Sequence, residues 1–170
     1  MAASSRQADM ATEIERKFLV RRLPDLHGVP AVRMAQGYLR ADARGSVRVR
    51  IAGDAACLTV KGPSRGRARL ELEYSIPAED ARLMMDSLTL GTLVEKVRYR
   101  IEHQGYVWEL DVFSGRNEGL VLAEVELDRV DEQPPLPPWV GREVSDDARF
   151  FNAHLAREPF DTWAEKPCAE

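Results

Sequence analysis

Hydrophobic and polar residues alternate with a period of two along most of the chain, a pattern that predicts β-strands. Turn-forming residues, among them Gly53-Asp54 and Gly105, interrupt the alternation. Eight segments carry it, namely residues 12–20, 32–40, 46–52, 55–61, 67–76, 93–102, 106–113 and 120–127. The alternation therefore predicts a chain made mainly of strands.

Two segments depart from the alternation and predict helices. The first begins at Pro77 and has Glu79 and Asp80 in its first turn, which is typical of a helix start. Its expected apolar stripe consists of Leu83, Met84, Leu88 and Leu90. The second helix is expected from about residue 146 to 156, with Ser145 as its N-cap. Many strands with two helices predict one α+β domain built on an antiparallel sheet or barrel.

Length and composition agree with a single globular domain. The chain has 170 residues, of which 44% are hydrophobic and 31% charged. We expect a disordered tail over residues 1–10, the domain over 11–158 and a loose C-terminal tail over 159–170. A net charge of -4 argues against a general nucleic-acid binder, which usually has a basic excess.

Nothing in the sequence indicates a membrane or secretory route. No apolar run approaches the roughly 18 residues of a membrane span, and the N-terminus lacks the apolar centre of a secretory signal. The two cysteines, Cys57 and Cys168, do not form a disulfide framework or a zinc motif. We expect a cytoplasmic protein without a membrane partner.

Like-charged side chains stand two residues apart on most of the predicted strands, so each pair shares one face. The pairs are Glu13 and Glu15, Arg48 and Arg50, Glu71 and Glu73, Lys96 and Arg98, Glu109 and Asp111, and Glu124 and Glu126. On a single strand this pattern is typical of a solvated face. Across many strands, repulsion of up to about 1 kcal/mol per close pair in water must be offset, by opposite charges or by bound ions.

The two kinds of pair suit different parts of one ligand. Carboxylate pairs are the ligands that Mg²⁺ and Mn²⁺ prefer. Arginine pairs bind phosphate oxygens through bidentate, charge-assisted hydrogen bonds. A face that carries both predicts a site for a complex of metal and polyphosphate.

The charged motifs, taken in order, resemble those of the CYTH superfamily, also called triphosphate tunnel metalloenzymes. Residues 13–17 match its opening E-x-E-x-K pattern, and residues 143–152 resemble its plug helix. The strands between are similar to its R-x-R, T-x-K, R-x-E-x-E, E-K-x-R-Y, E-L-D-V-F and E-x-E strands, at residues 48–50, 59–61, 69–73, 95–99, 109–113 and 124–126. The resemblance covers about residues 12 to 156.

This resemblance implies a fold and a set of roles. The implied fold is an eight-stranded antiparallel β-barrel, the triphosphate tunnel, with flanking helices and a C-terminal plug helix. The residues implied to bind phosphate are Lys17, Arg48, Arg50, Lys61, Lys96 and Arg98. The residues implied to hold one or two Mg²⁺ or Mn²⁺ ions are Glu13, Glu15, Asp111, Glu124 and Glu126. Of these residues, Lys96, Glu13 and Glu15 are expected to be catalytic, with Lys96 nearest the leaving phosphate. Glu71 and Glu73 are expected to orient the basic side chains or to position water.

The implied activity is the metal-dependent hydrolysis of a triphosphate, foremost inorganic tripolyphosphate to pyrophosphate and phosphate. A class IV-like adenylate cyclase and a thiamine triphosphatase are alternatives with the same metals and basic residues. A non-catalytic module that binds polyphosphate or nucleotide is a third reading, which the complete set of acidic residues disfavours. A homodimer is possible, because apolar outer faces that the helices leave uncovered must be buried elsewhere.

Overall fold

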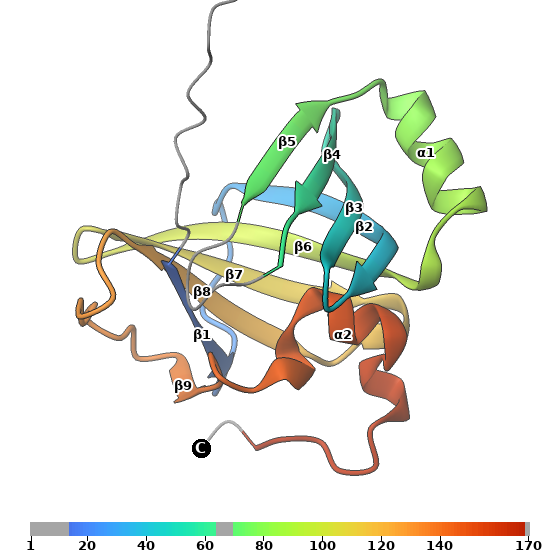
Figure 1. Cartoon of the computed structure of the whole chain (residues 1–170). Helices are drawn as coiled ribbons and strands as arrows, with labels where there is room; N and C mark the ends of the chain where they lie inside the picture. Colours follow the sequence, from blue (N-terminus) through green and yellow to red (C-terminus); the bar gives the residue numbers. More distant parts are fainter. Residues whose placement is uncertain (1–13, 64–69, 169–170) are drawn as a thin grey trace, which may run out of the picture.

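One antiparallel sheet forms the body of the molecule, in a computed structural model that describes residues 14–63 and 70–168 (Figure 1). Within this part of the chain the order of the strands is β5-β4-β3-β2-β6-β7-β8-β1-β9. The strands are β1 (Ile14–Val20), β2 (Ala31–Asp42), β3 (Gly45–Ala52), β4 (Ala55–Lys61), β5 (Glu71–Ser75), β6 (Leu90–His103), β7 (Tyr106–Ser114), β8 (Val121–Leu127) and β9 (Val140–Glu143). The helices are α1 (Ala78–Ser87) and α2 (Asn152–Arg157), and 3-10 turns lie at η1 (Gly115–Asn117), η2 (Ala148–Phe150) and η3 (Phe160–Thr162).

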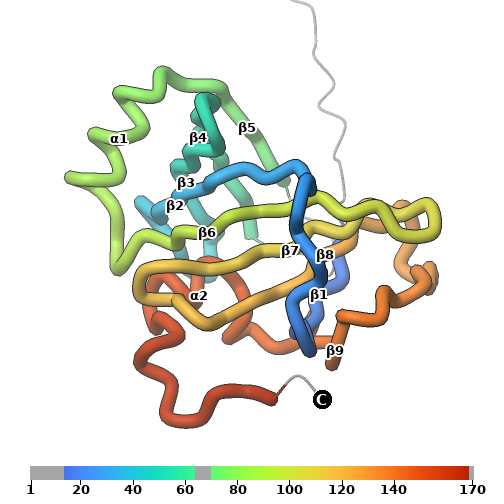
Figure 2. The backbone as a smooth tube through the Cα atoms, turned by 180° about the vertical axis from the view of Figure 1, so that it is seen from behind, coloured from blue at the N-terminus to red at the C-terminus, as the bar shows by residue number. Residues whose placement is uncertain are grey.

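The sheet differs from the expected eight-stranded closed barrel. It has a ninth strand, β9, and the pairing of the described strands ends at β5 on one side and at β9 on the other. β9 pairs with Phe18 and Val20 on the edge of β1 that faces away from β8. The backbone view from behind shows how strongly the sheet twists between β3 and β8 (Figure 2).

Two-residue turns connect the hairpins where the sequence places glycine. Gln104 and Gly105 both have positive φ, 48° and 85°, between the paired residues His103 and Tyr106. This is the geometry of a type I′ turn, whose twist matches that of the two strands. Gly53 likewise has a φ of 58° in the turn between β3 and β4.

The outer face of the sheet is apolar and packs in two places. Trp108, which is fully buried, packs with Phe18 and Trp139 beside β9. Farther along the sheet, Val49 packs against Ala81 and Met85 of α1. These two clusters leave the opposite face of the sheet to the charged side chains.

The apolar stripe of α1 is not the expected one. Leu83 is more than half exposed, and so are Leu88 and Leu90, which lie beyond the last residue of the helix, whereas Ala81 and Met85 are buried and Met84 packs beside them. The small side chain of Ala81 allows the helix to approach the sheet closely. A helix can thus bury small residues and leave larger ones in solvent, which counting large apolar residues does not predict.

A third apolar cluster closes one end of the charged face. Leu19, Val94 and Leu122 of the sheet pack there against Phe150 and Leu155. Figure 1 shows α2 at this end, beside the turn between β2 and β3. No helix among the described residues has the length and apolar character that a membrane crossing requires.

The plug segment is not one continuous helix. The 3-10 turn η2 and the helix α2 are separated by Phe151, which is extended with φ -75° and ψ 136°. Asp147, rather than Ser145, accepts a hydrogen bond at the start of η2, from the backbone N–H of Arg149. The extended residue redirects the chain between Phe150 and Leu155, both of which reach the apolar cluster.

The segment after α2, expected to be loose, contributes to the core. Phe160 is buried in the third cluster, and its backbone N–H donates to the side-chain oxygen of Asn117 at 2.9 Å. Trp163 packs edge-on against both Phe150 and Phe160. This part of the chain therefore covers the plug from outside.

Gly91 allows β6 to approach the end of α2, and this contact supplies a test of the docking. A Cβ at Gly91 would lie 2.2 Å from the carbonyl oxygen of Ala156. At Gly105, where φ is also positive, a Cβ would meet nothing within 4 Å. Both Gly→Ala changes should cost about 1–2 kcal/mol for the left-handed backbone. We predict that Gly91→Ala lowers the free energy of unfolding in urea by a further ~1–3 kcal/mol. Equal losses in the two variants would contradict this close docking.

Candidate functional site

The charged motifs lie on one face of the sheet, here called the charged face. Directly paired residues of an antiparallel sheet share a face, and the register pairs Lys17 with Glu124 and Arg98 with Asp111. On the other half of the sheet, Thr59 of β4 is paired with Arg48 and with Glu73. The structure thus brings together the described members of the predicted site. Glu13 lies outside the described residues.

Arg98 is the centre of the ion pairs on β6, β7 and β8. Its Nε and Nη2 each donate to a different oxygen of Asp111 at 2.7 Å, which is a bidentate pair. Nη2 also donates to Glu124 at 2.7 Å, and Nη1 donates to Glu109. Burial alone would lower the pKa of Arg98, but the hydrogen bonds and charges of these carboxylates raise it. The guanidinium is therefore a fixed positive charge.

Lys17 extends this network onto β1. Its ammonium donates to Glu124 and lies 3.5 Å from Glu15. Burial alone would lower the pKa of Lys17, but the charges of Glu124 and Glu15 outweigh it and the pKa is raised. Burial alone would likewise raise the pKa of the Glu124 carboxyl, whereas Lys17, Lys96 and Arg98 lower it to about 2. Both groups are therefore charged near neutral pH.

Lys96 lies where the charged face meets the apolar plug. It is only 3% exposed, donates to Asp111, and lies 5.3 Å from the centre of the Phe113 ring, which belongs to the plug cluster. Electrostatic interactions are stronger where water is excluded. Among the basic groups of the site, Lys96 is thus in one of the least polar environments.

A second group of charges spans β3, β4 and β5. Nη2 of Arg50 donates to Glu73 at 3.1 Å, and Lys61 pairs with Glu71 at 2.8 Å. The buried hydroxyl of Thr59 accepts from Arg48 at 3.3 Å and donates to Glu73 at 3.0 Å. Burial alone would raise the pKa of Glu73, but Arg50 and the hydrogen bond from Thr59 lower it. Glu71 and Glu73 are thus each paired with a basic side chain, of β4 and β3 respectively.

Two donors of this group are buried without a partner. The Nε atoms of Arg48 and Arg50 form no hydrogen bond with the described residues. Buried polar atoms are nearly always bonded, so two neighbouring orphans on one face indicate a missing acceptor. An anion with several oxygens is an acceptor that fits such a pair of guanidinium groups.

The carboxylates of Glu15 and Glu126 suit a hard cation. The register places them directly opposite each other on β1 and β8, where like charges repel. Glu126 forms no ion pair with the described part of the chain, whereas Asp111 and Glu124 are both occupied by basic groups. Within that part, no three acidic, histidine or cysteine residues are assembled into a metal site. Mg²⁺ is commonly held by only one or two carboxylates together with substrate phosphates, so this pair fits such an ion.

The structure connects two further polar residues to the site, in roles that the sequence pattern does not predict. Thr59 was recognised only as part of a motif, yet it links Arg48 to Glu73. Ser145 was expected to cap a helix, yet its hydroxyl binds the backbone of Lys17. The tertiary pairing, which no local pattern contains, decides both roles.

Comparison with protein families agrees with this geometry. The family model described as CYTH domain matches residues 11–151, which includes all of the charged strands. This chain belongs to the CYTH domain family.

Two relatives named inorganic triphosphatase resemble the chain over nearly their whole length. The inorganic triphosphatase of Acetivibrio thermocellus is 42% identical over 156 residues, covering 92% of this chain and 100% of the relative. That of Nitrosomonas europaea is 40% identical over 151 residues, covering 85% and 97%.

Solved structures show the same CYTH fold. The crystal structure of the inorganic triphosphatase NE1496 superposes with a TM-score of 0.66 at 38% identity, over 85% of this chain and 97% of that one. A putative adenylate cyclase from Bacillus halodurans has a TM-score of 0.54 at 17% identity, over 69% and 81%, a likeness of fold alone.

The Arg98 network supplies a stability test with a matched control inside the chain. Arg98 and Asp111 form a buried bidentate pair, whereas Arg129 and Asp131 form an exposed one. Removing one partner of a buried pair costs about 3–5 kcal/mol, while an exposed pair contributes ~0–1 kcal/mol. We expect Arg98→Met to lower the free energy of unfolding in urea by the larger amount and Arg129→Met by the smaller. A small loss for Arg98→Met would show that the buried network is not needed for folding.

Proposed function

We propose that this CYTH domain protein is an inorganic triphosphatase, which releases pyrophosphate and phosphate from tripolyphosphate with the help of divalent cations. The observation that carries the proposal is the identity of about two residues in five with two inorganic triphosphatases over nearly their full length. Basic and acidic side chains gathered on one face support it from the structure.

The basic residues are proposed to bind the substrate. Tripolyphosphate is a chain of anionic oxygens, and guanidinium groups bind such oxygens in pairs. The unpartnered Nε atoms of Arg48 and Arg50 favour a phosphate beside β3. The full proposed set is Lys17, Arg48, Arg50, Lys61, Lys96 and Arg98.

The acidic residues are proposed to hold Mg²⁺ or Mn²⁺. Glu15 and Glu126 are the best placed, because they face each other across β1 and β8 and Glu126 has no cationic partner among the described residues. Glu13, Asp111 and Glu124 complete the proposed set by their place in the family motifs. When bound, the metal would supply a Lewis acid for phosphate oxygens and lower the pKa of a coordinated water.

The chain's own residues would then lower the barrier to phosphoryl transfer. Water attacks the terminal phosphorus and gives up a proton to solvent, the bridging P–O bond breaks, and pyrophosphate leaves with the bonding electrons. Negative charge grows on the leaving oxygen, and fixed cations in a site that excludes water stabilise it strongly. Lys96, buried against Phe113, is proposed to lie nearest the leaving group.

Product release from purified protein tests the activity. With Mg²⁺ or Mn²⁺, we expect tripolyphosphate to be hydrolysed faster than ATP or thiamine triphosphate. Arg50→Gln, which removes a proposed phosphate ligand, should reduce kcat/KM for tripolyphosphate by about 10- to 100-fold, as expected for losing a charged hydrogen bond of ~1.5–3 kcal/mol. Arg129→Gln, at an exposed pair, should leave it unchanged. Formation of cyclic AMP from ATP would show that the protein is a cyclase instead of a hydrolase. Binding without turnover would show that it is a binding module.

Metal titration tests the acidic pair separately. We expect a chelator to abolish hydrolysis and added Mg²⁺ or Mn²⁺ to restore it. Glu126→Gln should raise the metal concentration at half-maximal rate by about tenfold or more, because one anionic ligand is lost. Glu118→Gln, outside the charged face, is the matched control. An unchanged metal requirement in Glu126→Gln would remove Glu126 from the metal site.

A further inference from the structure

The backbone of Lys17 is held by the segment that leads into the plug rather than by β8. Its N–H donates to the hydroxyl of Ser145 at 2.9 Å, and its carbonyl accepts from the N–H of Val144 at 2.8 Å. In an antiparallel pair of strands, the N–H and C=O of one residue point to the same side of the strand. At alternate residues that side faces away from the partner strand. Lys17 and Glu124 form such a pair, which brings their side chains together but leaves the backbone of Lys17 to Val144 and Ser145.

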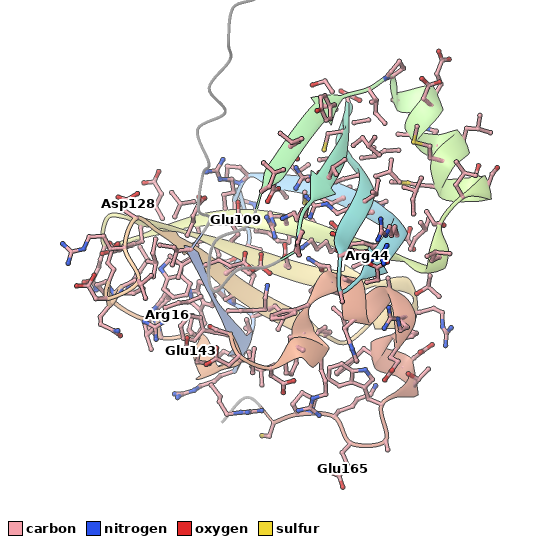
Figure 3. The ribbon with its side chains drawn as sticks, viewed as in Figure 1. Arg16, Arg44, Glu109, Asp128, Glu143 and Glu165 are labelled. Atoms are coloured by element: carbon pink, nitrogen blue, oxygen red, sulfur yellow. The ribbon has the colours of Figure 1, made fainter. Side chains whose placement is uncertain are left out.

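Ser145 is itself oriented by an ion pair. Its hydroxyl donates to Glu143 at 2.7 Å, and Arg16 binds both oxygens of that carboxylate at 3.0 and 2.6 Å. Figure 3 shows Arg16 and Glu143 next to each other beside β1. Because the proton of the hydroxyl points to Glu143, a lone pair is left to accept the N–H of Lys17.

The hydrogen bonds of the Lys17 backbone connect the charged face to the plug segment. On one side of β1, the ammonium of Lys17 is buried against Glu124, which also binds Arg98. On the other side, Val144 belongs to the plug cluster that contains Phe150. The position of the Lys17 ammonium therefore depends on the docking of the plug segment.

We propose that Ser145 is a positioning residue for the triphosphate site: its hydroxyl fixes the peptide of Lys17, and with it the ammonium that binds phosphate. The proposal rests on the proposed function for its kinetic consequence, but the position of the ammonium is measurable without turnover. Ser145→Ala removes the acceptor, leaves the N–H of Lys17 unbonded and lets β1 relax around this residue. Ser145→Thr keeps the hydroxyl.

The kinetic test compares three variants on tripolyphosphate. Ser145→Ala should raise KM by about tenfold with little change in kcat, since a buried N–H without its partner weakens a phosphate contact made in ground and transition states alike. Ser145→Thr should restore KM. Asp147→Ala, which removes the cap of η2 in the same segment but touches nothing on β1, should behave as the unchanged protein. An unchanged KM in Ser145→Ala would overturn the proposal.

Lysine labelling tests the position of the ammonium directly. Lys17 and Lys96 are both 3% exposed and both ion-paired, but only Lys17 is connected to Ser145. Acetic anhydride labelling read by mass spectrometry should therefore speed up at Lys17 in Ser145→Ala, by about tenfold, and stay unchanged at Lys96. Equal acceleration at both lysines would show general loosening and overturn the proposal, as would no acceleration at either.

The two measurements separate this inference from the proposed function. Failure of the unaltered protein to hydrolyse tripolyphosphate would contradict the proposed function. The labelling of Lys17 against Lys96 would still decide whether Ser145 positions the ammonium.

Discussion

The ion pairs around Arg98 are the interaction on which the charged face depends. A strand face can carry Asp111 and Glu124 at almost no exposure only if fixed cations meet them there. Arg98 joins β6 to β7 and β8, and Lys17 carries the network on to β1. Desolvating so many charges is costly, and an apolar network of the same shape is often as stable or more so. The network therefore stabilises the fold by less than its number of ion pairs suggests, although removing one partner alone leaves a buried charge uncompensated.

The same face changes from charged to apolar along its length, so its two ends have different environments. Leu19, two residues after Lys17, already belongs to the plug cluster, as does Phe113, two residues after Asp111. One end of the face is thus sealed by side chains while the other carries Glu15 and Glu126, which are both exposed. A bound anion would meet exposed carboxylates at one end and the dry surroundings of Lys96 at the other. The outer face has no such change from charged to apolar: α1, Trp139 and β9 cover apolar residues there.

Period-two alternation was enough to place the charged side chains on one face, because the strands carry their motifs in register with it. It was not enough for elements whose form depends on distant partners. β9 has four residues, too few to show a pattern, and exists because it covers the edge of β1. The plug breaks at Phe151 to direct Phe150 and Leu155 into one cluster, and Ser145 serves Lys17 rather than the helix. The stripe of α1 depended on how closely a helix can approach a sheet, which favours Ala81 over Leu83. Which carboxylate meets which cation follows from strand order, and that order is not written in any single segment.

The two ends of the strand ladder have a consequence for the behaviour of the protein at high concentration. A sheet whose described strands do not close exposes backbone donors and acceptors along its outermost strands, and such rows recruit other chains. Here the outermost strands are the shortest in the sheet, with five residues in β5 and four in β9. β5 also carries the charged residues Glu71 and Glu73, and charged side chains on an edge strand disfavour its pairing with another chain. Short margins that carry charged side chains thus disfavour fibre-like stacking, and the long central strands that hold the charged face lie where another chain cannot reach their backbone.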